Sequence, residues 1–321
     1  MARGRSWSGL AMAVGSGAAF GTSGVLARSL LDSGWSAAAA VTVRVAVAAL
    51  ALTVPALLLL RGRWSLLVRN LPAVLAFGLV AVAGCQLAYF LAVSRLSVGV
   101  ALLLEYSGVV LVVLWTWLRS RRRPSTTTLT GVAVAVGGLA LVLDVAGDVR
   151  VDPVGVTWGL VAAVGLAVFF VVSARTHDAL PPLVTSWAGM AVGAAALGLA
   201  GVLGAVPWAL TGSPVVLAGH RTSWLVPVLG LGLVAAALAY VLGVASVQRL
   251  GARLASFVGL TEVLFAVFFA WVALAQQPGP LQLVGGAVVL AGIVLVRLGE
   301  RPDEPAVEGP DPLPAMVPAR D

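Results

Sequence analysis

Apolar residues in long uninterrupted blocks are the feature that most restricts how this chain can fold. The chain has 321 residues, 60% of them hydrophobic and 10% charged, whereas an ordinary soluble domain has about 25% charged residues. The blocks are about 18 to 25 residues long, which is enough to cross about 30 Å of hydrocarbon at about 1.5 Å per residue. The expected solvent is therefore lipid, and we predict an all-α integral membrane protein.

Ten such blocks follow one another, and we predict one transmembrane helix for each. The blocks are Leu10 to Leu31, Ala37 to Leu60, Leu71 to Ser94, Val98 to Leu118, Thr128 to Leu143, Val154 to Ser173, Leu183 to Val206, Trp224 to Val247, Leu254 to Ala275 and Leu281 to Leu298. Because many blocks follow the first, we interpret it as a retained span rather than a cleaved signal peptide. Residues 299–321 are rich in proline and acidic residues, so we expect a disordered tail.

The positions of the arginines predict the orientation, because positively charged short loops stay in the cytoplasm. With the N-terminus inside, fifteen of the twenty arginines fall in cytoplasmic segments, and only Arg28, Arg95, Arg150 and Arg221 fall outside. Arginine without lysine, with much Ala, Gly, Val and Pro, is typical of GC-rich coding. We therefore expect a multi-pass protein of a bacterial inner (plasma) membrane, with residues 1–9 and the C-terminal tail in the cytoplasm.

The net charge of +7 does not indicate nucleic-acid binding, because the arginines lie in short loops and form no basic face. We expect the partners to be the lipid bilayer and a small-molecule substrate, with protons as a further candidate. We make no prediction of the oligomeric state.

An internal repeat divides the chain into two halves. A shift of 154 positions aligns them without a gap over a long stretch, and the matches include Arg95 with Arg249, Trp117 with Trp271, Pro124 with Pro278 and Gly138 with Gly292. Each half, residues 10–144 and 154–298, has five predicted spans. Because five is odd, the second half enters the membrane upside down, and such inverted repeats are a known route to alternating access. The alternative is a duplicated helical bundle without a transport role.

Three ionisable residues lie inside predicted spans, namely Arg44, Glu105 and Glu262. Each costs about 2.5 to 3.5 kcal/mol at a helix centre on insertion scales, so each is a functional candidate. The shift of 154 places Glu105 on Gly259, within one helical turn of Glu262, so inverted halves would bring both carboxylates to a shared cavity. A carboxylate in a low-dielectric site favours its protonated form, which would permit proton-coupled exchange. The alternative for Glu105 is a buried ion pair with Arg44 that fixes helix packing.

Uncharged polar residues near these positions are the next candidates for binding a substrate or a proton. Gln86 and Tyr89 lie in the third span, and Tyr240 lies at the position that repeats Gln86. Tyr106 and Thr261 are neighbours of the two glutamates. Such residues also serve as hydrogen-bonding contacts between helices, and that interpretation stays open for each of them.

Other sequence signals point to packing rather than chemistry. Cys85 is the only cysteine, which excludes an internal disulfide and a cysteine metal cluster, and we interpret it as a small packing residue. Gly17-x-x-x-Gly21, Gly155-x-x-x-Gly159 and Gly189-x-x-x-Gly193 would let helices approach closely. We find no phosphate-binding loop, metal motif or hydrolase elbow, so we expect no catalytic residues, no metal, no cofactor and no enzyme activity.

Two segments resemble a known family. Residues 98–115 in the fourth span and 255–271 in the ninth both have a small-residue entry, an apolar run, a short polar break and an apolar exit. This layout, over residues 10 to 298, resembles the EamA family of the drug/metabolite transporter superfamily. Members often carry proline where this chain has Val109 and Val263, and Gly-Glu where it has Gln276 and Gln277, so neither a proline-dependent helix break nor that glutamate's role carries over.

The resemblance implies transport of amino acids, related metabolites or drugs without ATP. We expect a secondary transporter, and specifically an exporter, that works by alternating access. A flippase or transporter for lipid-linked or nucleotide sugars in the same superfamily is one alternative. A second alternative is a membrane protein without transport activity, such as a membrane-embedded enzyme. A channel is disfavoured, because it would need a continuous polar stripe and no span has one.

Overall fold

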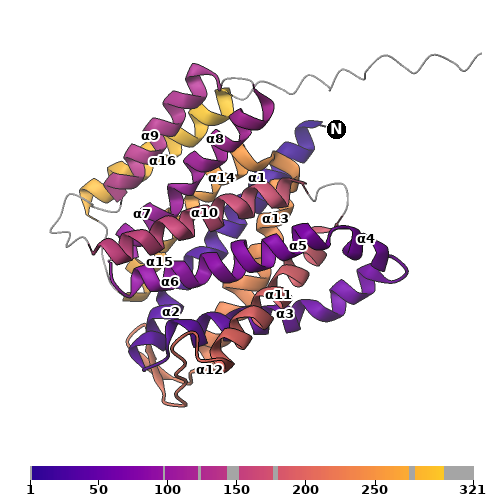
Figure 1. Cartoon of the computed structure of the whole chain (residues 1–321). Coiled ribbons are helices and arrows are strands. Elements are labelled where there is room, and N and C mark those ends of the chain that lie inside the picture. The colour runs from indigo at the N-terminus through magenta and orange to yellow at the C-terminus, as the bar shows by residue number, and fades with distance from the viewer. Residues whose placement is uncertain are drawn as a thin grey trace, which may run out of the picture.

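The computed structural model describes residues 2–96, 98–121, 124–142, 152–175, 180–274 and 279–299, and helices make up most of them (Figure 1). The elements of the first half are α1 (Ala2–Gly21), α2 (Ser23–Asp32), α3 (Ala37–Leu60), α4 (Trp64–Arg69), α5 (Leu71–Ala76), the π-helix η1 (Phe77–Gly84), α6 (Cys85–Val93), α7 (Val98–Tyr106), α8 (Gly108–Ser120) and α9 (Thr126–Val142). Those of the second half are α10 (Pro153–Arg175), α11 (Pro182–Val202), β1 (Val215–Leu217), β2 (His220–Thr222), α12 (Leu225–Leu229), the π-helix η2 (Gly230–Leu238), α13 (Ala239–Leu250), α14 (Ala252–Gly259), α15 (Thr261–Leu274) and α16 (Pro280–Gly299).

Seven continuous helical stretches among the described residues are long and apolar enough to cross a membrane. Two shorter apolar stretches, Thr126–Leu141 in α9 and Leu283–Val296 in α16, add to them. Large apolar side chains lie on the outer surface, where Leu50 is 73% and Val202 is 86% exposed. A surface of this kind fits lipid as the solvent, so the chain is a multi-pass membrane protein. The number of ten spans stays a prediction, and the tail from residue 300 lies outside the described residues.

Side-chain caps explain where two of the long helices begin. Ser36 precedes α3, and its hydroxyl accepts a hydrogen bond from the backbone N–H of Ala39 at 3.2 Å. Asp152 precedes α10, and its carboxylate accepts from the N–H of Val154 at 2.8 Å. Arg95 also donates to Asp152 at 3.2 Å. The backbone donor and the guanidinium stabilise the charged form and so lower the pKa of Asp152 below its ordinary value.

A short β-hairpin interrupts the otherwise helical chain. Strands β1 and β2 pair antiparallel, with Val216 opposite Arg221, around a turn in which Ala218 and Gly219 have φ values of 51° and 78°. The helix before it ends at Val202, so the predicted end of this span at Val206 is wrong. Two strands of three residues are too short to leave a readable alternation in the sequence, and for this reason the all-α prediction missed them.

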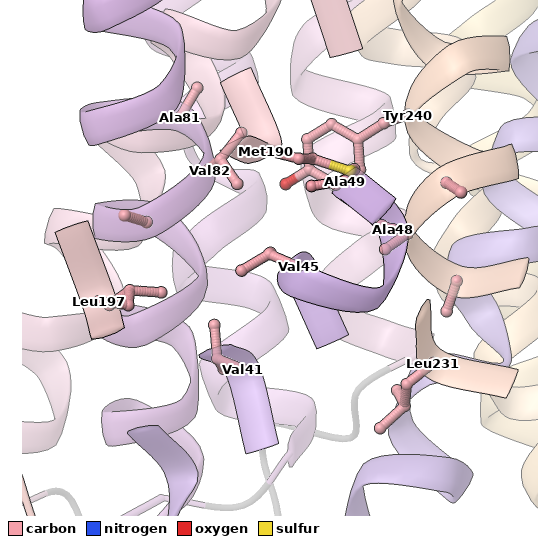
Figure 2. Close-up of a cluster of buried hydrophobic side chains, with 14 of the residues drawn as sticks. Val41, Val45, Ala48, Ala49, Ala81, Val82, Met190, Leu197, Leu231 and Tyr240 are labelled. Atoms are coloured by element: carbon pink, nitrogen blue, oxygen red, sulfur yellow. The ribbon is translucent and has the colours of Figure 1, made fainter. Parts of the chain in front are cut away.

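The main core lies where α3, α11, η1 and η2 pack together. Figure 2 shows Val45 of α3, Val82 of η1, Met190 of α11 and Leu231 of η2 around this core. Close helix contacts depend on glycine here: a Cβ added to Gly189 would lie 2.3 Å from the Phe77 ring, so α11 can approach η1 only because the side chain is absent. The expected close approach at this glycine motif is therefore confirmed.

Helices α9 and α16 lie side by side at one edge of the molecule (Figure 1). Gly131 lies against Val296, whereas Gly138, further along α9, lies against Val289. Residue numbers that rise in one helix while they fall in the other mean that the two helices run antiparallel. The shift of 154 places Thr126 on Pro280, so these two helices are equivalent elements of the repeat.

The two π-helices also occupy equivalent places. The shift of 154 carries η1, residues 77–84, onto residues 231–238, and η2 covers residues 230–238. A π-helix is rare and commonly marks a functional site, since it widens the turn and redirects the side chains that follow. Gln86 follows η1 and Tyr240 follows η2, so the paired π-helices aim equivalent residues at the middle of the protein.

Candidate functional site

Two interrupted helices carry the glutamates. Glu105 is the penultimate residue of α7, which stops at Ser107 before α8, and Glu262 is the second residue of α15, which follows a stop at Leu260. At both stops the backbone has ψ near −20°, typical of the tighter 3₁₀ conformation. The helix is therefore broken at both places without the prolines that the family often has.

Equivalent hydroxyl groups accompany the two breaks. Ser107 donates to the carbonyl of Leu104 at 2.6 Å, and Thr261 donates to the carbonyl of Val258 at 2.7 Å. Ser107 and Thr261 are 154 positions apart. A hydroxyl that bonds back to a carbonyl three residues earlier competes with the regular helical bond and favours a local distortion. The hydroxyl of the candidate Thr261, at the start of α15, is thus bonded to the preceding helix α14 across the break.

Glu262 forms a contact between the halves of the chain. The hydroxyl of Tyr106, which is 3% exposed, lies 2.6 Å from a carboxylate oxygen of Glu262 and 3.2 Å from the carbonyl of Gly259. Helix α1 packs close to the same break, because a Cβ on Gly17 would lie 2.7 Å from the Thr261 hydroxyl. Tyr106 therefore links the α7 break to the α15 break.

Glu105 has a different partner from the one that its sequence position suggested. Its carboxylate lies 3.5 Å from the sulfur of Cys85, which is also 3.3 Å from the carbonyl of Ala162. Glu105 is 8% exposed. Cys85 is therefore more than the packing residue that we predicted, and only the register of α6 against α7 and α10 reveals this contact.

Arg44 is held by neutral groups. It donates to the hydroxyl of Ser23 at 3.1 Å, to the side-chain oxygen of Gln86 at 2.9 Å and to the carbonyl of Ala235 in η2. Its centre also lies 6.0 Å from the Phe20 ring. The ion pairs among the described residues include Arg28 with Asp32 and Arg95 with Asp152, but none between Arg44 and Glu105. The expected ion pair of Arg44 with Glu105 is thus not formed in this conformation.

Gln86 and Tyr240 join the two halves at their equivalent positions. The side-chain amide of Gln86 donates to the Tyr240 hydroxyl at 3.1 Å. The two residues are 154 positions apart, so a repeat-equivalent pair is in direct contact. Such a contact is expected where a twofold pseudo-symmetry axis passes between two related halves.

A cavity, here called the central cavity, lies between these elements and has a volume of about 60 Å³. Its polar lining is formed by Ser16, Cys85, Gln86, Glu105, Tyr106, Tyr240, Ser246 and Glu262. Its apolar lining includes Phe20, Leu166, Phe169 and Phe170. A few polar groups among apolar walls are typical of the lining of a small-molecule site. Sequence reasoning missed the serines and phenylalanines, since nothing in an apolar span marks which face points inward.

A second cavity, here called the side cavity, has a volume of about 50 Å³. Arg44, Ser23, Gly24, Tyr89 and Leu102 line it together with Phe20, Gly21, Gln86, Glu105, Glu262 and Ala266. Both glutamates line both cavities, whereas Arg44 lines the side cavity. The structure thus brings seven of the eight predicted site residues to these walls, and Thr261 lies beside them.

The charges of the site suit binding and exchange better than covalent chemistry. Two carboxylates and one guanidinium line the side cavity, and no group of three metal-ligating side chains occurs within the described part of the chain. Carboxylates can bind a cation or a proton, and a guanidinium can bind an oxyanion.

Comparison with known proteins matches both halves of the chain to one family. The model of the EamA-like transporter family matches residues 7–144 and again residues 153–298. A protein of Archaeoglobus fulgidus described as an uncharacterized transporter is 27% identical over 207 residues, which are 64% of this chain and 70% of that protein. A solved structure, titled only as the crystal structure of a protein, shares the fold with a TM-score of 0.72 and 18% identity, over 91% of this chain and 96% of the other.

Proposed function

Because the chain belongs to the EamA-like transporter family, we propose that it is a secondary transporter that exports amino acids or related small metabolites by alternating access. Proteins of this family are transporters rather than enzymes. The observation that carries the proposal is the placement of Glu105 and Glu262, one from each half, at helix breaks that face shared cavities.

An inverted repeat supplies the mechanical part of the proposal. The repeats are residues 10–144 and 154–298, each with five spans. Support comes from the antiparallel packing of the equivalent helices α9 and α16 and from the contact between the equivalent residues Gln86 and Tyr240. In alternating access the halves exchange conformations, so that a site at their interface opens first to one side of the membrane and then to the other.

The arginine distribution supports an inner-membrane protein with both termini in the cytoplasm. In this orientation, loading from the cytoplasm and release on the opposite side would constitute export. Proton exchange at the glutamates would provide the driving force, since an unoccupied carboxylate can accept a proton from the outer side and give it up inside.

Flux into proteoliposomes under an imposed pH gradient tests this function. The assay measures the flux of each compound in a panel of amino acids and cationic compounds. It compares the flux into proteoliposomes with the flux into protein-free vesicles. If one proton is exchanged per substrate, a gradient of one pH unit sustains about a tenfold concentration ratio, because one unit corresponds to about 1.4 kcal/mol. No flux of any compound under either gradient direction would overturn the proposed function.

The variant Glu262→Gln tests proton coupling. Glutamine keeps the shape and can still contact Tyr106, so the protein should fold, but it cannot carry a proton between the two sides. We expect exchange of substrate across the membrane to persist while the pH-driven concentration ratio falls from about ten to about one.

Asp32→Asn is the matched control, because it also changes a carboxylate to an amide but lies in an exposed ion pair with Arg28, outside both cavities. It should keep the driven ratio. A Glu262→Gln protein with unchanged pH dependence would remove this residue from the coupling role.

A further inference from the structure

Arg44 is a buried cation for which the described part of the chain provides no anionic partner at contact distance. The residue is 2% exposed, and its three hydrogen bonds go to a serine hydroxyl, a glutamine amide oxygen and a backbone carbonyl. Its Nε atom is buried and has no hydrogen-bond partner among the described residues. A guanidinium removed from water without a counter-charge is unfavourable. The position therefore calls for an anion that the described residues do not supply at contact distance.

The surroundings of Arg44 hold the guanidinium in place without neutralising it. The Ala235 carbonyl that accepts from Nη2 lies in η2, and Ser23 and Gln86 accept from Nη1. These neutral acceptors fix its position, so the positive charge stays available to the side cavity. A planar guanidinium matches the two oxygens of a carboxylate and can bind them in parallel.

The two carboxylates line the same space as Arg44. Glu105 and Glu262 line the side cavity together with Arg44, and both also line the central cavity. Phe169 and Phe170 line the central cavity but not the side cavity, and give the central cavity an apolar wall. The order along the two cavities is therefore a positive group, negative groups and an aromatic surface.

From this order we propose that Arg44 binds a carboxylate of the transported molecule in the side cavity, while Glu105 and Glu262 face its amino group. The ligand is then a small zwitterion whose apolar side group lies against the phenylalanines of the central cavity. The proposal rests on the transport function proposed above and adds to it a role for each charge. It predicts that removal of either charged group from the ligand weakens binding.

The proposal is tested by measuring, with calorimetry, the affinity of three matched compounds for the purified full-length protein in detergent. L-Phenylalanine has both charges, L-phenylalaninamide lacks the negative one at nearly the same size, and 3-phenylpropanoate lacks the amino group. Wild type should bind L-phenylalanine about 10 to 100 times more tightly than the amide, the range for one hydrogen-bonded charge. Equal binding of acid and amide, or binding of none of the three, would overturn the proposal.

The variant Arg44→Gln should remove this preference, so that acid and amide bind equally. Arg249→Gln is the matched control, since Arg249 lines neither cavity and contacts Met12 and the Ala245 carbonyl instead. It should keep the preference. A preference that survives in Arg44→Gln would overturn the assignment to Arg44.

If Arg44→Gln does not fold, the binding of the three compounds to wild type still decides the ligand class. Arg44→Lys then serves as the second variant. It keeps the positive charge but loses the planar guanidinium, so it should reduce the preference for the acid over the amide. Flux measurements separate this proposal from the proposed function. If wild type transported compounds that lack a carboxylate as fast as compounds that have one, the role of Arg44 would be contradicted and the transport function would remain intact.

Discussion

At the scale of single residues, the hydrogen bond between Tyr106 and Glu262 connects the two halves beside the cavities. The variant Tyr106→Phe removes the hydroxyl and keeps the ring. Hydrogen bonds between transmembrane helices contribute about 0.6 kcal/mol on average and up to about 1.7 kcal/mol. We expect a loss in this range, towards its upper end because the acceptor is a carboxyl group. Unfolding of the purified protein in mixed detergent micelles measures it.

Tyr89→Phe is the control for this change, since Tyr89 also lines the side cavity but forms no hydrogen bond that is found among the described residues. It should unfold like wild type. Equal losses in the two variants would mean that the Tyr106 hydroxyl has no special role.

The sequence predicted the charged residues of the site better than their contacts. Arg44, Glu105 and Glu262 stand out because an ionisable group in an apolar span is costly and therefore rare. Cys85 carries no such signal, and its contact with Glu105 depends on how α6 and α7 are placed against each other. The repeat indicated that Gln86 and Tyr240 occupy equivalent positions, and the structure places these two residues in contact.

At the scale of elements, the π-helices and the helix breaks recur in both halves, but local sequence did not predict them. Apolar content identified each span as a helix, whereas the breaks at Ser107 and Leu260 arise within otherwise helical runs. The helix geometry at each break is set by a hydrogen bond from a hydroxyl to the preceding turn and by packing against α1 and α10. Both depend on the folded structure. The hairpin at Val215–Thr222 was not predicted, because its strands are too short to leave a pattern in the sequence.

The contact of α9 with α16 gives a prediction for a single glycine. A Cβ on Gly292 would lie 2.5 Å from the backbone nitrogen of Ala135, and backbone atoms cannot move aside as a flexible side chain can. Gly292→Val should therefore lower the free energy of unfolding by about 1 to 3 kcal/mol, the usual cost of overpacking. Unfolding in mixed micelles is again the measurement.

Gly137→Val is the matched control on the partner helix, because a Cβ there meets no described atom within 4 Å. Its stability should stay close to that of wild type. If both variants lost the same stability, the cost would come from valine in a helix and not from the α9–α16 contact.

At the scale of the whole molecule, the repeat is the property that the sequence made most accessible. An offset of 154 positions was visible in Arg, Trp, Pro and Gly. The structure places the ends of η1 and η2 at this offset and the two helix breaks, at Ser107 and Leu260, within one residue of it. Apolar periodicity contains little information on which helices are neighbours, because every lipid-exposed face is as apolar as the core. Neighbours such as α1 and α15 therefore had to come from the structure.

The orientation of the halves in the membrane leads to the last prediction, which concerns Arg95 and Arg249. Both are exposed, and they occupy equivalent positions of the repeat. Because Cys85 is the only cysteine, a Cys85→Ala background allows Arg95→Cys and Arg249→Cys to be labelled one at a time with a thiol reagent that does not cross membranes. Five spans per half require the two sites to lie on opposite sides of the bilayer.

In intact cells, the cysteine at position 95 should react and that at position 249 should react only after the membrane is opened. The Cys85→Ala protein without a new cysteine shows the background. Labelling of both positions from the same side would mean that the halves are parallel. Parallel halves could not exchange conformations by inversion, so the inverted-repeat mechanism proposed around Glu105 and Glu262 would be ruled out.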